Sequence, residues 1–128
     1  MKVVIDTSIL IDYLRGGTKW EAFIENVDKE AELFLPTVVI FELFSGSSTK
    51  NQQKKQDVVD LLKQFHKIDL DEQIAKRAGE LFRDLKKNLQ VPDYIVAASA
   101  LETGAAVLTL NTKHFQQIPH LSLYPLEK

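Results

Sequence analysis

The chain has 128 residues, 45% hydrophobic and 27% charged, with a formal net charge of −2. These values are typical of one globular domain with a single core, and they exclude a globally basic nucleic-acid binder. We therefore expect residues 1–128 to form a single domain. The absence of cysteine excludes disulfides and thiolate metal sites and favours a cytoplasmic location. Neither a membrane span nor a secretory signal is expected.

Apolar runs, which predict strands, alternate along the chain with amphipathic patterns, which predict helices. In the first half these are a strand at 3–5 ending on Asp6, a helix from 7 or 8 to the glycines at 16–17, a helix at 19–28, a strand at 33–35 and an ambiguous run at 38–44. In the second half they are a helix with apolar positions 58, 61, 62 and 65, an edge strand at 66–70, a helix with apolar positions from 74 to 85, a helix from 92 to 104, a strand at 106–109, a loop or short turn at 111–117 and an edge strand at 121–124. This alternation predicts an α/β fold with a mostly parallel central sheet.

Local signals help to place several element ends. Thr18 and Glu21 have the spacing of a capping box for the helix at 19–28. The β-branched run at 38–44 suggests a strand, but it follows Pro36 so closely that no crossover would fit, and we favour a helix. Gly104 is a natural stop for the helix before it.

Three carboxylates stand where a surface charge is not expected. Asp6 ends the first strand, Glu42 interrupts an apolar run, and Asp93 heads a helix of small apolar residues. Each has an ordinary explanation: Asp6 and Asp93 as capping or first-turn acids, Glu42 as one solvated position on an amphipathic helix. Because ligands bind at the carboxyl ends of strands in open parallel sheets, we expect the three to meet there.

Neighbouring carboxylates raise one another's pKa, and a divalent cation compensates their charge. Oxygen ligands suit Mg²⁺ or Mn²⁺, whereas His66, His114 and His120 lack the spacing of a zinc site. Carboxylate-held Mg²⁺ indicates phosphoryl-transfer or phosphodiester chemistry. Dinucleotide-binding, P-loop and nucleophile-elbow motifs are absent from the sequence.

Four segments in order resemble the motifs of PIN-domain ribonucleases, most closely the VapC-type toxins of toxin–antitoxin pairs. They are residues 4–12 (VIDTSILID), 37–46 (TVVIFELFSG), 92–100 (PDYIVAASA) and 108–115 (LTLNTKHF), and Ile118, Pro119 and Leu121 continue the closing pattern. The resemblance covers the whole chain. It implies that Asp6, Glu42 and Asp93 are the acids that hold Mg²⁺ or Mn²⁺, with Thr7 as the nearby hydroxyl.

The last segment departs from the family pattern. The family often places a fourth acid there, at the position of Asn111 or of His114, and neither is acidic here. We expect Asn111 to orient a water or the substrate phosphate through its amide. The departure leaves open whether one or two metals bind. Asp12, farther along the first helix, is interpreted as lying outside the ligand set.

The resemblance also implies an α/β/α three-layer sandwich, endonucleolytic cleavage of RNA, a homodimer and a cognate antitoxin that blocks the site. Basic residues are available for an RNA path, or else form solvated helix faces: Lys50, Lys54, Lys55, Lys63, Arg77, Arg83, Lys86 and Lys87. Trp20, Phe41 and Phe44 are interpreted as core residues, with an apolar dimer or antitoxin surface as the alternative.

The sequence thus predicts a metal-dependent endoribonuclease that acts as the toxin of a toxin–antitoxin pair. One alternative is a catalytically weak PIN scaffold that binds RNA or protein without cleavage, suggested by the missing fourth acid. Another is a different Mg²⁺-dependent phosphotransfer protein. Against it, receiver domains pair acids at the first strand, and phosphatases of the haloacid dehalogenase type need a second Asp where Ser8 stands.

Overall fold

The computed structural model describes residues 1–85 and 89–126. Within them a four-stranded sheet has the order β3-β2-β1-β4, and every strand pair is parallel. The strands are β1 (Lys2–Ile5), β2 (Glu32–Pro36), β3 (His66–Ile68) and β4 (Ala106–Leu108). The predicted parallel sheet is confirmed, with β3 at one edge. The edge strand expected at 121–124 is wrong, because that segment makes only an isolated bridge between Leu123 and Val107.

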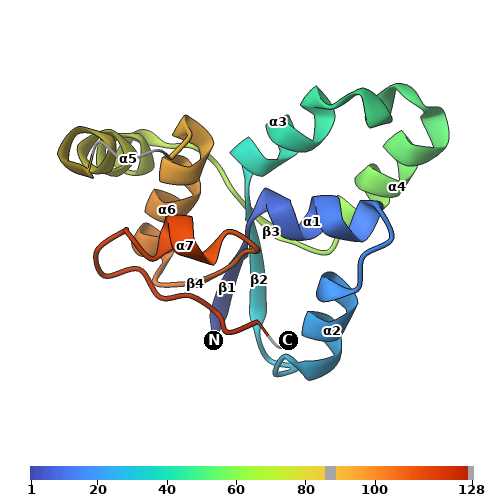
Figure 1. The fold of residues 1–128 in the computed structure, drawn as a ribbon, viewed down its shortest axis with the longest axis horizontal. Coiled ribbons are helices and arrows are strands. Elements are labelled where there is room, and N and C mark those ends of the chain that lie inside the picture. Colours follow the sequence, from blue (N-terminus) through green and yellow to red (C-terminus); the bar gives the residue numbers. More distant parts are fainter. Residues whose placement is uncertain (86–88, 127–128) are drawn as a thin grey trace.

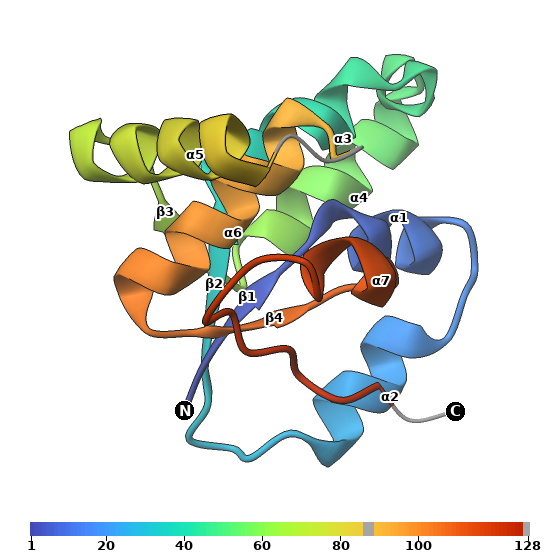
Figure 2. The same cartoon turned by 60° about the vertical axis from the view of Figure 1, so that its left-hand side comes forward.

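Helices cover both faces of this sheet, so the α/β/α arrangement is confirmed. They are α1 (Thr7–Leu14), α2 (Lys19–Asn26), α3 (Thr37–Ser45), the 3₁₀ turn η1 (Ser47–Lys50), α4 (Gln52–Leu62), α5 (Glu72–Leu85), α6 (Val91–Thr103) and α7 (Thr112–Phe115). Figure 1 shows α5 and α6 on one side of the strands and α1, α2 and α4 on the other. In Figure 2 the segment after β4 leads to α7, beside α1.

Beyond Lys2, strand β1 is completely buried because helices pack on both faces of the sheet. Val3, Val4 and Ile5 have no exposed surface. On α6 the small side chains of Ala97 and Ala98 are also fully buried, so this helix packs closely on the sheet. No helix among the described residues has the length and apolar content that a membrane span requires.

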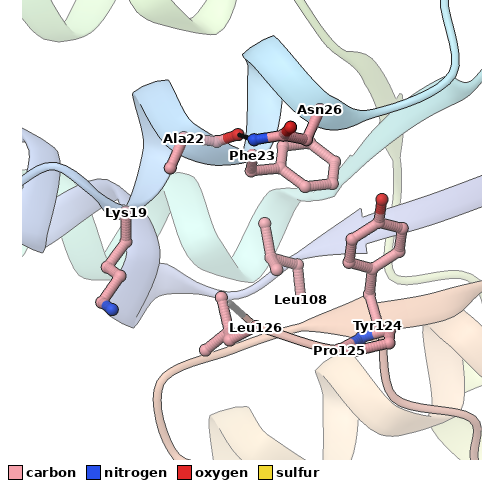
Figure 3. A pocket seen from close by; sticks show the side chains of 8 residues that line it. All are labelled: Lys19, Ala22, Phe23, Asn26, Leu108, Tyr124, Pro125 and Leu126. Atoms are coloured by element: carbon pink, nitrogen blue, oxygen red, sulfur yellow. Dashed lines mark hydrogen bonds between the residues drawn. The ribbon is translucent and has the colours of Figure 1, made fainter. Parts of the chain in front are cut away.

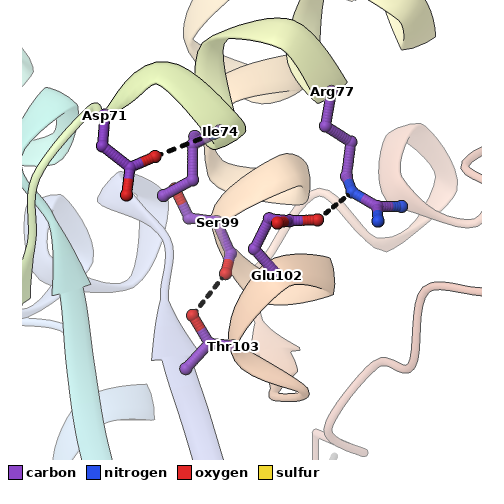
Figure 4. Close-up of polar contacts among 6 residues, drawn as sticks. All are labelled: Asp71, Ile74, Arg77, Ser99, Glu102 and Thr103. Atoms are coloured by element: carbon purple, nitrogen blue, oxygen red, sulfur yellow. Dashed lines mark hydrogen bonds and ion pairs between the residues drawn. The ribbon is translucent and has the colours of Figure 1, made fainter.

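Helices α5 and α6 pack against each other, and Figure 4 shows polar contacts at and beside their interface. The Asp71 carboxylate accepts a hydrogen bond from the Ile74 backbone at the start of α5, over 2.9 Å. Arg77 of α5 forms an ion pair with Glu102 of α6. The pair fixes the relative position of the two helices, although its exposure limits its contribution to stability.

Several predicted helix ends are confirmed and one is wrong. The run at 38–44 is helical, as favoured, and α6 ends at Gly104, whose φ of 72° is the left-handed conformation of a helix stop. Thr18 precedes α2, but its side chain makes no capping hydrogen bond. The Asp12 carboxylate accepts from the Lys19 backbone N–H instead, over 3.3 Å.

The three aromatic residues with two interpretations fall in different environments. Trp20 is buried in the core, where its ring lies 5.6 Å from that of Phe23 and 5.4 Å from that of Phe65. Phe44 packs against the core and is partly buried, whereas Phe41 is 68% exposed. The core interpretation therefore fails for Phe41 alone.

Candidate metal centre

Asp6 lies at the point where the order of strands reverses. From β1 the chain moves outward through β2 to β3, then returns to place β4 on the other side of β1. The Asp6 backbone N–H donates to the Leu108 carbonyl over 3.0 Å, so Asp6 extends the pairing of β1 with β4. Ligands of open α/β sheets bind in the crevice at this position.

Two hydroxyl groups orient the Asp6 carboxylate. Its Oδ2 accepts hydrogen bonds from Ser8 Oγ at 2.7 Å and from Thr109 Oγ1 at 2.8 Å. Asp6 and Thr109 are buried, 3% and 1% exposed. The Ser8 oxygen also accepts from the Leu110 backbone N–H over 3.0 Å, which links the ends of β1 and β4. Both bonds use Oδ2, so Oδ1 has lone pairs available for another partner.

The Glu42 side chain is oriented by Thr7, the hydroxyl residue that the family resemblance places near the acids. Thr7, which is buried, donates its Oγ1 hydrogen to Glu42 Oε1 over 2.6 Å. Burial raises the pKa of Glu42, the Thr7 hydrogen bond lowers it, and the charges of Asp6 and Asp93 raise it further. The net result is a raised pKa. Helix α3 therefore points its one acid toward the end of β1.

Asp93 has a structural role as well as a place near the other acids. Its Oδ2 accepts from the Gln90 backbone N–H over 3.1 Å, and Gln90 reciprocates in a capping box at the start of α6. The first-turn interpretation is thus confirmed. Burial raises the pKa of Asp93, the Gln90 bond lowers it, the Asp6 charge raises it and His114 lowers it, with a net rise.

The structure brings Asp6, Glu42 and Asp93 into one electrostatic field from three elements distant in sequence. The pKa of Glu42 responds to both aspartates, and the pKa of Asp93 responds to Asp6. Within residues 1–85 and 89–126, no three His, Asp or Glu side chains already form a cage for an ion. The acids are therefore neighbours whose side chains are held by internal hydrogen bonds, and their role as ligands stays a prediction.

The position where the family often has a fourth acid, Asn111, is polar and solvent-accessible. Asn111 is exposed, and its backbone N–H donates to Thr109 Oγ1 over 2.9 Å. Asn111 and Ser8 line a groove of about 560 Å³ that also includes Asp12 and Arg15. Asp12 lies at this groove, but its carboxylate accepts a hydrogen bond from the Lys19 backbone.

Sequence reasoning missed Ser8 and Thr109 as site residues. Their hydroxyl oxygens lie 3.3 Å apart although the residues are 101 positions apart in the chain. The sequence offered one indication for Ser8, because it follows Asp6 by two residues and its hydroxyl is therefore within reach of that carboxylate. Thr109 ends the strand paired beside β1, and only the pairing of β4 with β1 makes that position significant.

Another cavity lies away from these acids. It measures about 360 Å³ between α2 and the C-terminal segment, and it is largely apolar (Figure 3). Its lining includes Phe23, Leu108, Tyr124 and Leu126 but none of the three acids Asp6, Glu42 and Asp93. The chemistry of the side chains therefore places the candidate site at the strand ends.

Three of the six basic residues that were proposed for an RNA path and lie in the described part of the chain are paired with acids. Lys63 contacts Asp60, Arg77 contacts Glu102, and Arg83 contacts Asp84. These three fit the interpretation as solvated helix faces. Lys86 and Lys87 lie outside the described residues.

Comparisons with known proteins agree with the fold and the motifs. A model of the PIN domain family matches residues 3–121. Ribonuclease VapC10 of Mycobacterium tuberculosis is 29% identical over 122 residues, covering 93% of this chain and 90% of the relative. Ribonuclease VapC2 of Rickettsia felis is 29% identical over 134 residues and covers 100% of both chains.

Solved structures give the same result. VapBC2 of Rickettsia felis, bound to a DNA fragment from its promoter, superposes with a TM-score of 0.87 at 23% identity, over 99% of this chain and 100% of the other. A toxin–antitoxin complex from Klebsiella pneumoniae gives a TM-score of 0.79 at 27% identity, over 98% and 99% of the two chains. The chain belongs to the PIN domain family and is related to the VapC ribonuclease toxins of VapBC toxin–antitoxin systems.

Proposed function

We propose that this single-domain chain is a Mg²⁺- or Mn²⁺-dependent endoribonuclease that acts as the toxin of a toxin–antitoxin pair. The observation that carries the proposal is the electrostatic interaction among Asp6, Glu42 and Asp93, which contributes to the raised pKa of Glu42 and of Asp93. The relatives named ribonuclease support the reaction class. Acids that hold a divalent cation suit phosphodiester chemistry, and the relatives are named ribonucleases. Both lines of support lead us to propose hydrolysis of RNA phosphodiester bonds.

The side chains present fit a hard divalent cation. Three carboxylates supply oxygen donors only, and burial with like-charge repulsion raises the pKa of Glu42 and of Asp93. A cation at this position removes the cause of the repulsion. Asp6, Glu42 and Asp93 would hold it, directly or through water. When bound, it lowers the pKa of a water and offsets charge on the reacting phosphate.

The residues around the acids position them. Ser8 and Thr109 orient Asp6, Thr7 orients Glu42, and the capping box orients Asp93. Asn111 stands at the open side, where its amide is able to donate to a substrate phosphate or orient a water.

Partners follow from the same proposal. The solved relatives include toxin–antitoxin complexes, and we propose that an antitoxin covers the acid site of this chain. We also propose a homodimer, for which the apolar groove between α5 and α6, lined by Leu70, Phe82 and Val91, offers an exposed surface. The cytoplasmic location stays a prediction.

One alternative deserves the same test, namely a PIN scaffold that binds RNA or protein without cleavage. It is favoured by the absence of a fourth acid at Asn111 and by the lack of a preformed three-acid cage among the described residues. Calorimetry with Mn²⁺ separates the two proposals, because a binding-only scaffold has no need of the metal. If the wild-type protein binds Mn²⁺ and the Asp6→Asn variant binds it more weakly, the result supports the proposed enzyme.

Asp6→Asn provides the direct test of activity. The substitution keeps the shape of the side chain but removes one ligand charge, so we expect RNA cleavage with Mg²⁺ or Mn²⁺ to fall by more than about 100-fold. Cleavage of a labelled RNA pool by purified protein measures it, with circular dichroism to verify the fold. Glu21→Gln, which removes an exposed carboxylate from α2, should cleave at the wild-type rate. Wild-type cleavage by Asp6→Asn would exclude the assigned site.

A further inference from the structure

A second groove lies beside Glu42, between α1 and the segment formed by α3, η1 and α4. Figure 1 shows α1 lying below the turn that these three elements make. The groove has a volume of about 430 Å³, and Glu42, Arg15 and Lys54 all line it. It continues the acid site away from β4, so a substrate held at the acids would extend into it.

Arg15 borders both grooves. It lines the 430 Å³ groove with Glu42 and the 560 Å³ groove with Ser8 and Asn111, and Ile11 is shared in the same way. Arg15 follows α1 directly, which places it at the end of the helix that also begins with Thr7. An RNA strand that occupied both grooves would therefore pass Arg15.

The two cations of this groove are available for an external anion. Arg15 and Lys54 are exposed, and neither belongs to the four ion pairs formed within residues 1–85 and 89–126. The acids of the groove already have partners, since Glu42 accepts from Thr7 and Asp57 accepts from Gln53 over 2.9 Å. If a metal cation neutralised Glu42, Asp57 would be the one carboxylate left in the groove to balance Arg15 and Lys54.

We propose that Arg15 and Lys54 bind backbone phosphates of the RNA next to the cleaved bond, so that the strand lies along α1 from Asn111 to Lys54. The inference rests on the proposed function and adds the path of the substrate to it. A guanidinium matches a phosphate through two parallel N–H donors, and an ammonium acts as a point charge. The hydroxyls of Ser47 and Ser48, at the same groove, add neutral donors.

This path differs from a general basic surface. Lys55 follows Lys54 on α4 and is exposed, but it is not among the residues that line the groove. It therefore provides a matched control, with the same helix, the same charge and one residue of separation. Phosphate contacts of this kind strengthen binding without selecting a base sequence.

The experiment compares Arg15→Gln, Lys54→Gln and Lys55→Gln in two measurements. The first is cleavage kinetics of a labelled RNA with Mg²⁺, where we expect Arg15→Gln and Lys54→Gln each to raise KM about 5-fold with little change in kcat. The second is binding of a fluorescent single-stranded oligoribonucleotide of mixed sequence, in the Asp6→Asn background. Each groove variant should reduce the slope of log K against log salt by about 0.7, the value for one phosphate contact on single strands.

The outcomes distinguish this inference from the proposed function. If the wild-type protein cleaves RNA but the groove variants match Lys55→Gln in KM and in salt slope, the phosphate path is wrong and the nuclease stands. If the wild-type protein does not cleave, the proposed function fails, and the salt slopes still decide whether Arg15 and Lys54 bind RNA. No binding of RNA by the Asp6→Asn protein at low salt overturns the path as well.

Discussion

At the scale of the residue, each of the three acids is held by a neighbouring hydrogen-bond donor. Asp6 accepts from the hydroxyls of Ser8 and Thr109, and Glu42 accepts from the hydroxyl of Thr7. Such bonds favour the ionised form, whereas burial and like charges favour the neutral form. For Glu42 the second group of effects prevails and its pKa is raised. The site therefore opposes full ionisation unless positive charge is added.

Glu42→Gln tests this electrostatic strain. A carboxyl whose pKa is raised on folding costs stability above its folded pKa, and the cost disappears as the pH falls below the unfolded pKa of about 4.3. In EDTA at pH 7 the variant should therefore be more stable than the wild type, by less than about 1 kcal/mol because solvent screens the half-buried group. Urea unfolding at several pH values measures the difference, which should shrink as the pH falls toward 4.

Asp84→Asn provides a control, because the pKa of Asp84 is lowered in the folded protein whereas that of Glu42 is raised. The Arg83 hydrogen bond lowers the pKa of Asp84, so the wild-type carboxylate favours the folded state at neutral pH. Removing it should not stabilise the protein at pH 7. A Glu42→Gln protein that is less stable than the wild type at pH 7 without metal would contradict the proposed strain.

At the scale of the element, the connection between α1 and α2 depends on close approach. The Asp12 carboxylate lies over Gly17 and accepts from the Lys19 backbone, while the Gly17 N–H donates to the Asp12 carbonyl over 2.8 Å. A Cβ at Gly17 would overlap the Asp12 carboxylate. This contact supplies the helix cap that the sequence had assigned to Thr18, because the backbone N–H groups at a helix start donate to any well-placed carboxylate.

Gly17→Ala should therefore displace Asp12 and lose the cap of α2. We expect a loss of about 1 kcal/mol in the free energy of unfolding, from the range for lost caps, partly offset by reduced freedom of the unfolded chain. Urea denaturation followed by circular dichroism measures it. Gly79→Ala, inside α5 with nothing within 4 Å of the new Cβ, should stabilise by about 0.5–1 kcal/mol. Equal or greater stability of Gly17→Ala would show that Asp12 has no capping role.

At the scale of the whole molecule, three of the eight exposed large apolar side chains among the described residues lie at one groove between α5 and α6. Leu70, Phe82 and Val91 are 50%, 49% and 63% exposed, and all three line this groove of about 300 Å³. The Phe82 ring packs edge-on against Tyr94, with 5.6 Å between the ring centroids, so its position is defined. The proposed homodimer would cover these side chains.

Phe82→Glu should disrupt that dimer. A charge at the centre of an apolar contact is costly to bury, and we expect the dissociation constant to rise by at least about 10-fold. Sedimentation velocity at several concentrations measures the shift from dimer to monomer. Ile24→Glu is a matched control, because Ile24 is 41% exposed on α2 and is not a lining residue of the groove. Equal sedimentation of the two variants would place the interface elsewhere.

The sequence by itself determined the elements and the three acids. Asp6, Glu42 and Asp93 stand out because a carboxylate within an apolar run has to be explained. The helix at 38–44 was favoured because the run follows Pro36 too closely for a crossover to a second strand. The predicted strand at 121–124 failed, because alternation of apolar residues does not specify whether a neighbouring strand offers enough hydrogen bonds to extend a sheet.

Only the tertiary structure decided which distant groups meet. The strand order β3-β2-β1-β4 places Thr109 beside Asp6, and no local pattern encodes a hydroxyl that acts from 103 residues away. The same holds for Arg15, which borders both grooves because α1 lies between them. Sequence patterns report which face of an element is buried, whereas the site depends on how those faces pack against one another, a property of the whole chain.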